Sequence, residues 1–422
     1  MAPAAARPTD EQLSPKDSRD ALNDQSFVPF KIVAREDVSP NAFVLTVRLA
    51  SKTDPDKEPS KASRKLTRQR MDEAWRHGLW SVEVKQPQLQ IARDYTPLPE
   101  VDGTYADGDG DGDGDTHMRL FVRVVPGGEV SRYLSRLAVG SRIGLRGPRR
   151  SFDVVARLGE SGKKTNGHSQ QSELSEFRDD SAPVPDPETE EPKKMVVLAG
   201  GTGVATALQA ADAALRALPT VSVTVLWANR LPYDGAGLKA EANLGANNTN
   251  NTRNPIVRDI RALQARYGAD RLQVQSFVDA ENTRITEADV RKAIGAKEPE
   301  TSWFRPWRKE PQRLTSTMPT EEVDRWAEVH RENAACAYHS YSLLVRRSSD
   351  PWRNPNSPTP ACSCREAKDL ILVSGPEGFI EAWAGPKTWM SGKERQGTVD
   401  GILRRMAVQD PQTFSKWQVL KL

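Results

Sequence analysis

Residues 93–99 have the sequence Arg93-Asp94-Tyr95-Thr96-Pro97-Leu98-Pro99 and end a β-rich stretch of the chain. An arginine guanidinium forms paired hydrogen bonds to phosphate oxygens, so Arg93 is a candidate phosphate ligand. The ring of Tyr95 offers a flat apolar face with a polar tip, which suits packing against a planar cofactor. On these seven residues alone, a surface arginine and a structural tyrosine explain the pattern equally well.

Alternating apolar residues on both sides of this motif predict antiparallel strands. We expect a hairpin over residues 30–49 and further strands over residues 79–84, 89–99 and 118–125. The basic segment over residues 51–76 is expected to form an exposed helix inserted before the strand at residue 79. Residues 1–26 are expected to be disordered, and their five acidic residues argue against a secretory signal or a transit peptide.

Two glycine-containing segments follow the motif about 30 residues downstream. The first runs Gly127-Gly128-Glu129-Val130-Ser131-Arg132-Tyr133-Leu134 and is expected to open a short helix. Backbone N–H groups at such a helix start, together with the Ser131 hydroxyl, are suited to an anionic pyrophosphate. The second, residues 140–148, is expected to be a closing strand that ends in a Gly-Pro turn.

The second half of the chain alternates short apolar runs with helical segments, which predicts a parallel sheet with crossover helices. Strands are expected over residues 195–199, 222–227, 271–277 and 369–373, and helices over residues 205–218, 256–267 and 285–294. Right-handed crossovers bring all strand C-termini to one edge of the sheet, where ligands bind in such folds.

Two loops are predicted at that edge. Gly200-Gly201-Thr202-Gly203 lies directly between a strand and a helix, which is the context of a dinucleotide phosphate loop. Ser374 and the segment Gly375-Pro376-Glu377-Gly378 follow the strand at 369–373. After the second strand, Arg230 would favour a 2′-phosphate and Asp234 a free ribose, and the balance favours NADH over NADPH.

Taken together, these motifs resemble those of the ferredoxin reductase and cytochrome b5 reductase superfamily, with matching order and spacing over roughly residues 27–380. The resemblance implies an N-terminal antiparallel β-barrel that binds FAD, followed by a Rossmann-like domain that binds NADH or NADPH. It implies that Arg93 pairs with the FAD pyrophosphate, that Tyr95 packs against the isoalloxazine, and that Thr96 lies near flavin N5. The remaining cofactor-binding candidates are Gly128, Glu129, Val130, Ser131, Gly200, Gly201, Thr202, Gly203, Gly375, Pro376, Glu377 and Gly378.

Two positions depart from the superfamily pattern. Ser374 occupies the position of a cysteine that lies beside the nicotinamide, and Thr206 occupies that of a proline. The resemblance places Thr96 and Ser374 nearest the reacting atoms, and loss of the thiol is expected to slow hydride transfer. Both changes are also compatible with an FAD-binding protein that has lost its activity.

A narrower resemblance lies in residues 379–389 and 392–406, which are similar to the fungal mitochondrial cytochrome c import factor flavoproteins. It implies a mitochondrial location, at the inner membrane or in the intermembrane space, and haem or a haem protein (cytochrome c or its lyase) as electron acceptor. A non-catalytic assembly or docking factor is one alternative, and a cytochrome b5 reductase-like diaphorase acting in the cytoplasm is another.

Composition and insertions limit the other functions. The net charge of +3, from 60 basic and 57 acidic residues, gives no case for nucleic acid, and no apolar run is long enough to span a bilayer. The acidic loop at 107–115 lacks the final glutamate and flanking helices of a calcium loop, so we predict no metal.

We expect a flavin domain over residues 27–157, a linker over residues 158–192, and a nucleotide domain over residues 193–422 with insertions at 237–254 and 299–364. The Trp-rich segment at 303–307 is compatible with docking of a partner, with contact to a membrane surface, or with partial burial in the core.

Overall fold

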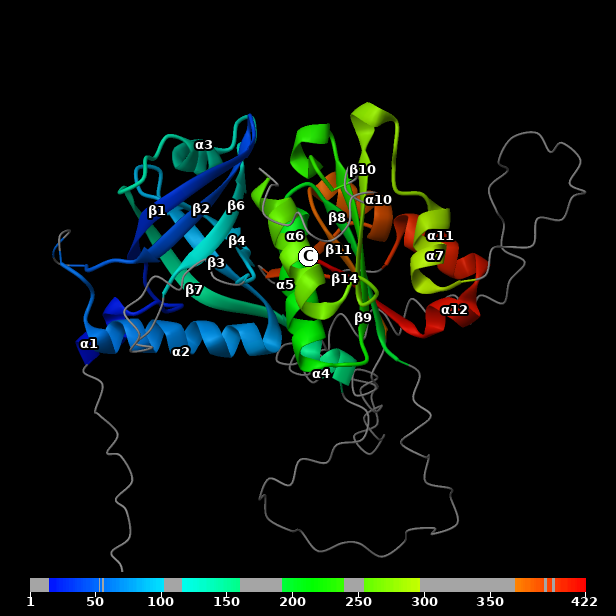
Figure 1. Ribbon diagram of the computed structural model, residues 1–422, viewed down its shortest axis with the longest axis horizontal. Helices are drawn as coiled ribbons and strands as arrows, with labels where there is room; N and C mark the ends of the chain where they lie inside the picture. Colours follow the sequence, from blue (N-terminus) through cyan, green and yellow to red (C-terminus); the bar gives the residue numbers. More distant parts are fainter. Residues whose placement is uncertain are drawn as a thin grey trace, which may run out of the picture.

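The computed structural model describes residues 15–52, 54, 57–101, 116–159, 192–238, 254–296, 369–390, 393–396 and 399–422. These residues form two lobes that lie side by side (Figure 1). The acidic loop at 107–115, the Trp-rich segment at 303–307 and almost all of the predicted linker and insertions lie outside the described residues.

The N-terminal lobe is a seven-stranded antiparallel sheet in the order β4-β3-β7-β1-β2-β6-β5. Because β4 also contacts β6, the sheet curls into the expected barrel, called the barrel below. The side chains inside it are alternate residues of the strands, such as Val82 and Val84 on β3. The strands are β1 (Val28–Ser39), β2 (Ala42–Leu49), β3 (Gly78–Gln86), β4 (Ile91–Tyr95), β5 (Pro97–Leu98), β6 (Met118–Arg123) and β7 (Arg142–Asp153).

The C-terminal lobe is a five-stranded parallel sheet in the order β10-β9-β8-β11-β14, called the parallel sheet below. Its strands are β8 (Lys194–Gly200), β9 (Ser222–Asn229), β10 (Leu272–Val278), β11 (Asp369–Ser374) and β14 (Trp417–Lys421). The chain moves outward from β8 to β10 and then returns to β11 on the other side of β8. The gap between β8 and β11 is therefore the switch point at which such sheets bind ligands.

Helices cover both faces of the parallel sheet. One face packs against α5 (Gly203–Ala217) and α6 (Pro255–Tyr267). The other face packs against α7 (Glu287–Ile294), α10 (Glu377–Ala384), α11 (Gly401–Gln409) and α12 (Pro411–Ser415). A short hairpin, β12 (Thr388–Met390) and β13 (Lys393–Arg395), lies between α10 and α11 in the chain.

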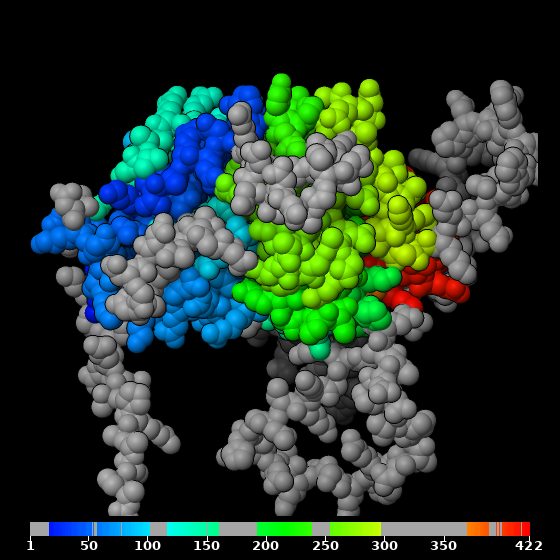
Figure 2. Space-filling view, in the orientation of Figure 1, coloured from blue at the N-terminus to red at the C-terminus, as the bar shows by residue number. Residues whose placement is uncertain are grey.

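The two lobes share one hydrophobic core. Barrel residues such as Val44, Leu98 and Phe121 belong to the same buried cluster as α5 and the inner face of the parallel sheet. The lobes accordingly lie in direct contact in the space-filling view (Figure 2). Burial of this apolar surface is the main force that holds them together.

Residues 15–26 correct the expectation that residues 1–26 are disordered. Helix α1 (Pro15–Asp20) packs on α2 (Lys61–His77), and Ala21 and Leu22 are completely buried. The backbone N–H of Leu22 donates to the Thr67 hydroxyl at 3.0 Å. This part of the chain is fixed by tertiary contacts that its acidic composition did not predict.

Helix α2 runs below the barrel in Figure 1 and is exposed on one face only. Met71, Ala74 and Trp75 point into the barrel core, which corrects the prediction of an exposed helix. The predicted limits of two loops also shift. Leu158 is buried at the end of α4 (Val154–Gly159) rather than in a linker, and Asn254 is the N-cap of α6 rather than part of an insertion.

Candidate functional site

Strand β4 positions Arg93 and Tyr95 at the edge of the barrel sheet. They pair in register with Val84 and Val82 of β3, so their side chains lie on the inner side of the wall. Tyr95 packs against the barrel core, and burial raises the pKa of its phenol to about 12, although the nearby Arg93 opposes the shift. The phenol is therefore neutral over the physiological range and presents an uncharged ring.

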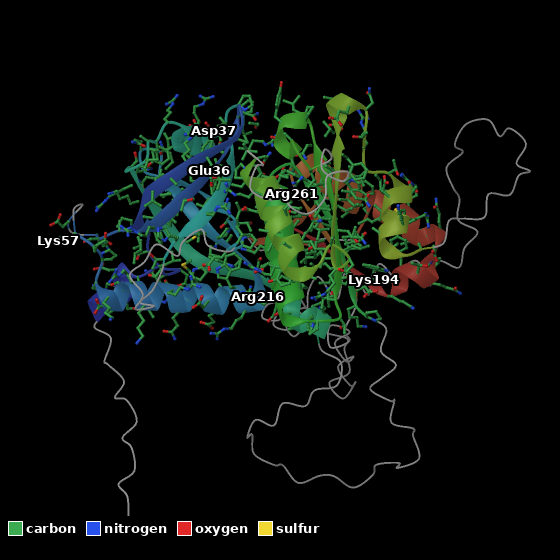
Figure 3. The ribbon with its side chains drawn as sticks, viewed as in Figure 1. Glu36, Asp37, Lys57, Lys194, Arg216 and Arg261 are labelled. Atoms are coloured by element: carbon green, nitrogen blue, oxygen red, sulfur yellow. The ribbon has the colours of Figure 1, made fainter. Side chains whose placement is uncertain are left out.

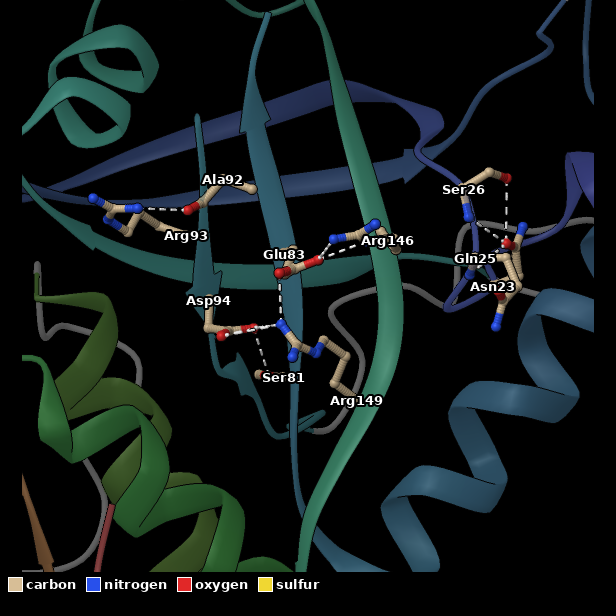
Figure 4. A network of polar contacts seen from close by, with 10 residues as sticks. All are labelled: Asn23, Gln25, Ser26, Ser81, Glu83, Ala92, Arg93, Asp94, Arg146 and Arg149. Atoms are coloured by element: carbon tan, nitrogen blue, oxygen red, sulfur yellow. Dashed lines mark hydrogen bonds and ion pairs between the residues drawn. The ribbon is translucent and has the colours of Figure 1, made fainter. Parts of the chain in front are cut away.

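Among the described residues, Arg93 differs from Arg146 and Arg149 of this wall in having no acidic partner. Arg146 and Arg149 donate to the two Glu83 carboxylate oxygens at 2.6 and 2.5 Å, on the outer side of the wall (Figure 4). Arg93 is exposed, points away from this network, and within the part of the chain that the structure describes donates only to the carbonyl of Ala92, at 2.8 Å. Within the described residues its guanidinium is thus available to an anionic ligand, which fits a phosphate partner.

The helix start after β6 is built from backbone groups. Gly128 is the N-cap of α3 (Glu129–Ser135), and a Cβ at Gly128 would lie 2.8 Å from the Ser131 hydroxyl. That hydroxyl accepts from Val125 N at 3.1 Å, so it closes the turn internally. The side chain of Val130 is buried in the barrel core. The predicted phosphate contacts here therefore depend on backbone N–H groups rather than on these side chains.

The two glycine loops meet at the C-terminal edge of the parallel sheet. A Cβ at Gly203 would lie 2.3 Å from the carbonyl oxygen of Ser374, and a Cβ at Gly375 would lie 3.0 Å from Gly200 Cα. Gly201 has a φ of +55°, in the left-handed region that favours glycine. The loops after β8 and β11 are thus in backbone contact at the switch point, and Ser374 is buried beneath them.

One polar contact joins the barrel motif to this edge. The Thr96 hydroxyl, at the end of β4, lies 3.4 Å from the Thr206 hydroxyl in the first turn of α5. Thr206 is the residue that departs from the superfamily's proline. The structure therefore brings Thr96 beside the segment that begins with the Gly200–Gly203 loop, whereas Ser374 lies on the adjacent β11 loop.

Arg123 is a candidate residue that the sequence analysis missed. It lies at the end of β6, and its Nη2 is 2.7 Å from Oδ2 of Asp234 in the short helix η1 (Pro232–Gly235). Its guanidinium carbon would lie 3.9 Å from a Cβ on Gly201, so a barrel cation borders the Gly200–Gly203 loop. Asp234 is buried and faces Arg123, while Arg230 is exposed.

Gln209 is a second residue that sequence reasoning missed. It is fully buried on α5, accepts from the backbone N–H of Trp80 at 2.9 Å, and donates to the carbonyl of Pro97 at 3.2 Å. Pro97 follows Thr96 directly. One side-chain amide of α5 thus satisfies two buried backbone groups of the barrel.

A network of ion pairs joins α6 to the barrel. Arg119 of β6 donates from Nη1 to both carboxylate oxygens of Asp259 at 2.7 Å, and both side chains are almost wholly buried. Beside this pair, Arg258 donates to Glu36 of β1 at 2.8 Å. Figure 3 shows Glu36 on the side of the barrel next to α6, and Arg216 near the C-terminal end of α2. These contacts fix the relative position of the two lobes.

The described residues contain no group of three or more His, Cys, Asp or Glu side chains arranged to hold a metal ion. In the same part of the chain, no helix is both long and apolar enough to cross a bilayer.

Known proteins resemble parts of this chain. The cytochrome c mitochondrial import factor CYC2 of Saccharomyces cerevisiae is 30% identical over 147 residues, which are 32% of this chain and 34% of the yeast protein. The match therefore spans about one third of that relative's length.

Solved structures show weaker likeness. The cytochrome b5 reductase domain of Ulva prolifera nitrate reductase has 19% identity and a TM-score of 0.33, covering 61% of this chain and 75% of that one. The CS-b5R domains of human Ncb5or have 12% identity and a TM-score of 0.40, covering 93% and 69% respectively. These TM-scores are below 0.5, so the fold is assigned from the order and direction of the strands and not from these likenesses.

The model of the oxidoreductase FAD-binding domain matches residues 79–154. This segment begins in β3, contains the Arg93–Thr96 motif and the helix start at Gly128, and ends after β7. Residues 79–154 of this chain are therefore similar to the FAD-binding domains of oxidoreductases.

Proposed function

We propose that this chain is an NAD(P)H-dependent flavin oxidoreductase that passes electrons through FAD to haem or a haem protein. One observation supports this most strongly: the Arg93–Thr96 strand of an FAD-binding domain lies against the helix that begins at a dinucleotide-type glycine loop. The two halves of a hydride-transfer site are thereby placed next to each other.

Each candidate residue has a role that follows from its surroundings. Arg93, which lacks an acidic partner among the described residues, would hold the FAD pyrophosphate together with backbone N–H groups in the first turn of α3. Tyr95 would pack its neutral ring against the isoalloxazine, and Thr96 would donate a hydrogen bond near flavin N5. When bound, FAD would supply the chemistry, since it accepts a hydride and releases electrons singly.

The nicotinamide dinucleotide would lie at the switch point. Gly200, Gly201, Thr202 and Gly203 would receive its phosphates, with Arg123 as an additional cation, and the segment from Ser374 to Gly378 would border the nicotinamide. Both NADH and NADPH are candidate donors. The sequence favours NADH through Asp234, but in the structure this carboxylate is buried against Arg123, so the preference depends on other residues.

The acceptor and the location follow from the yeast relative. Its name links it to cytochrome c import in mitochondria, so we propose haem, cytochrome c or its lyase as acceptor and a mitochondrial location for this chain.

Anaerobic stopped-flow absorbance tests the proposal. The full chain, loaded with FAD, is mixed with NADH or NADPH, and ferric haem is added after the oxidised flavin band has bleached. Bleaching by one nucleotide followed by reoxidation with haem supports the reductase and identifies its donor. A colourless protein that takes up no FAD would overturn the assignment.

A non-catalytic FAD-binding assembly factor is the second candidate, because Ser374 and Thr206 both depart from the superfamily pattern. It predicts a yellow protein that neither nucleotide bleaches. A general diaphorase would instead bleach normally and transfer electrons to many acceptors without preference for haem.

Arg93→Ala tests the proposed cofactor contact. Loss of a charge-assisted bidentate pair contributing about 1.5 to 3 kcal/mol should weaken FAD retention by roughly tenfold or more. Retention is measured as flavin released on dilution. Arg149→Ala is the control, because that arginine pairs with Glu83 on the outer face of the same wall. Full flavin occupancy in Arg93→Ala would contradict the assigned role.

A further inference from the structure

A hollow on the outer wall of the barrel has the composition of a ligand site. Its volume is about 370 Å³, within the usual size range for small-molecule pockets. Strands β1, β3 and β7 form its floor. The lining residues are Phe27, Pro29, Lys52, Lys85, Pro87, Tyr133, Arg142, Ile143 and Gly144.

The hollow exists because a glycine occupies the middle of the wall. In the sheet register Gly144 of β7 lies between Pro29 of β1 and Lys85 of β3. A Cβ at Gly144 would lie 3.5 Å from the Phe27 Cβ and 3.8 Å from both the Lys85 Cβ and the Phe27 Cδ1, which are ordinary contacts. A larger side chain is thus sterically allowed at this position, and glycine leaves the space open.

The charge of the hollow is uniformly positive. Among the described residues that line it, Lys52, Lys85 and Arg142 are cations and none is Asp or Glu. In the part of the chain that the structure describes, none of these three side chains forms an ion pair with a carboxylate, and Arg142 donates to the carbonyl of Asp54 at 3.2 Å. Three cations around one hollow suit the three oxygens of a phosphate monoester.

The remaining lining residues are apolar and partly aromatic. The rings of Phe27 and Tyr133, with two prolines, provide flat surfaces against which a ligand ring packs. Phe27 is itself held in place by Lys85, 5.3 Å from its ring centroid, and by Arg146 at 4.6 Å.

This hollow is separate from the FAD-binding candidates. Lys85 and Gly144 alternate along their strands with Val84 and Leu145, whose side chains lie inside the barrel. Arg93 is the cross-strand partner of Val84, so it lies on the opposite side of the wall. None of the proposed cofactor-binding residues lines the hollow.

We propose that this hollow binds a small ring-bearing phosphate of the mononucleotide class, as a site additional to those for FAD and the nicotinamide dinucleotide. The phosphate would contact Lys52, Lys85 and Arg142, and the ring would pack on the Tyr133 side.

Calorimetric titration with AMP tests this on the full chain saturated with FAD and NAD⁺, so that both proposed cofactor sites are filled. We expect one AMP per chain with a Kd below about 1 mM, and roughly tenfold weaker binding in Lys85→Gln/Arg142→Gln. Gly144→Leu should abolish binding by filling the hollow. Lys31→Gln is the matched control, because Lys31 is the exposed cross-strand neighbour of Arg142 and does not line the hollow.

The outcomes separate the alternatives. AMP binding that Gly144→Leu leaves unchanged, or that appears only when NAD⁺ is omitted, would place AMP in the dinucleotide site and overturn the proposal. Inorganic phosphate binding as tightly as AMP would show that the ring contributes nothing, which would contradict the assigned ligand class. No heat with either probe at millimolar concentration would also refute it.

Discussion

Asp259→Ala should destabilise the chain more than any change to an exposed ion pair. Asp259 lies on α6 and accepts two hydrogen bonds, each 2.7 Å long, from Nη1 of Arg119 in the barrel. The side chains are 0% and 1% exposed respectively, so no water replaces the lost carboxylate without rearrangement. The substitution leaves a buried guanidinium that still has the Glu36 carboxylate 3.7 Å away.

The expected cost can be worked from this geometry. Breaking a buried ion pair by removing one partner costs about 3 to 5 kcal/mol, because the remaining charge is uncompensated. The residual attraction of Glu36 places the value near the lower end, at about 3 kcal/mol. The double variant Arg119→Met/Asp259→Leu removes both charges and fills the space, so it should cost much less than the single variant.

Equilibrium unfolding in urea, followed by tryptophan fluorescence, measures the effect as a shift of the midpoint at constant slope. Glu287→Ala is the control. It breaks the Arg405–Glu287 pair on the surface, whose side chains are 59% and 35% exposed, and should cost at most about 1 kcal/mol. Equal shifts for Asp259→Ala and Glu287→Ala would refute the view that this buried pair fixes the two lobes.

Three further predictions concern the site and the C-terminal strand. Gly203→Ala places a Cβ 2.3 Å from the Ser374 carbonyl oxygen, so the two glycine loops must separate. We expect this variant to retain FAD but to lose bleaching of the flavin band by the nicotinamide nucleotide. An unchanged bleaching rate would contradict this prediction. Burial lowers the pKa of Lys421 from 10.5 to about 8. Between pH 8 and 10.5 the Lys421 amine is therefore protonated in the unfolded chain and neutral in the folded chain, so the unfolded chain binds more protons than the folded one. The unfolding free energy of the native chain, measured relative to that of Lys421→Met, should rise across this pH window by on the order of 3 kcal/mol. No rise in a pH series of urea titrations would exclude that shift. Thr206→Val removes the hydroxyl beside Thr96, so it should slow flavin reduction by roughly 2- to 10-fold and shift the flavin reduction potential. Thr206→Ser should restore both the rate and the potential. If the native chain and both variants had the same potential, Thr206 would have no positioning role.

Those parts of the fold and of the candidate site that depend on residues close together in the chain could be predicted from the sequence. The strands around Tyr95 and the glycine loops at Gly200 and Gly375 are each determined by residues close together in the chain, through alternation of apolar side chains and through backbone space. The helical face of α2 also had such a signal. Met71, Ala74 and Trp75 follow the spacing of a buried helical stripe, although the density of charge on this segment suggested an exposed helix.

Features created by tertiary contact were not predictable. Strand β14 was missed because its buried residues include Gln418 and Lys421, and the Lys421 backbone is satisfied by Gln396, 25 residues earlier. Arg123 and Asp234 are 111 positions apart and meet only because the lobes dock. No local pattern distinguishes such an ion pair from two surface charges.

The buried amide of Gln209 has a consequence for how the chain selects its ligands. Because α5 is hydrogen-bonded to backbone groups of β3 and of the segment after Thr96, the spacing between the two proposed cofactor sites is set when the chain folds. Selection between NADH and NADPH would then depend on which nucleotide fits this fixed spacing, rather than on a conformational change that closes the protein around the correct nucleotide. Substitutions in the packing of α5, far from any ligand, would alter that spacing and could change selectivity without changing a single contacting residue.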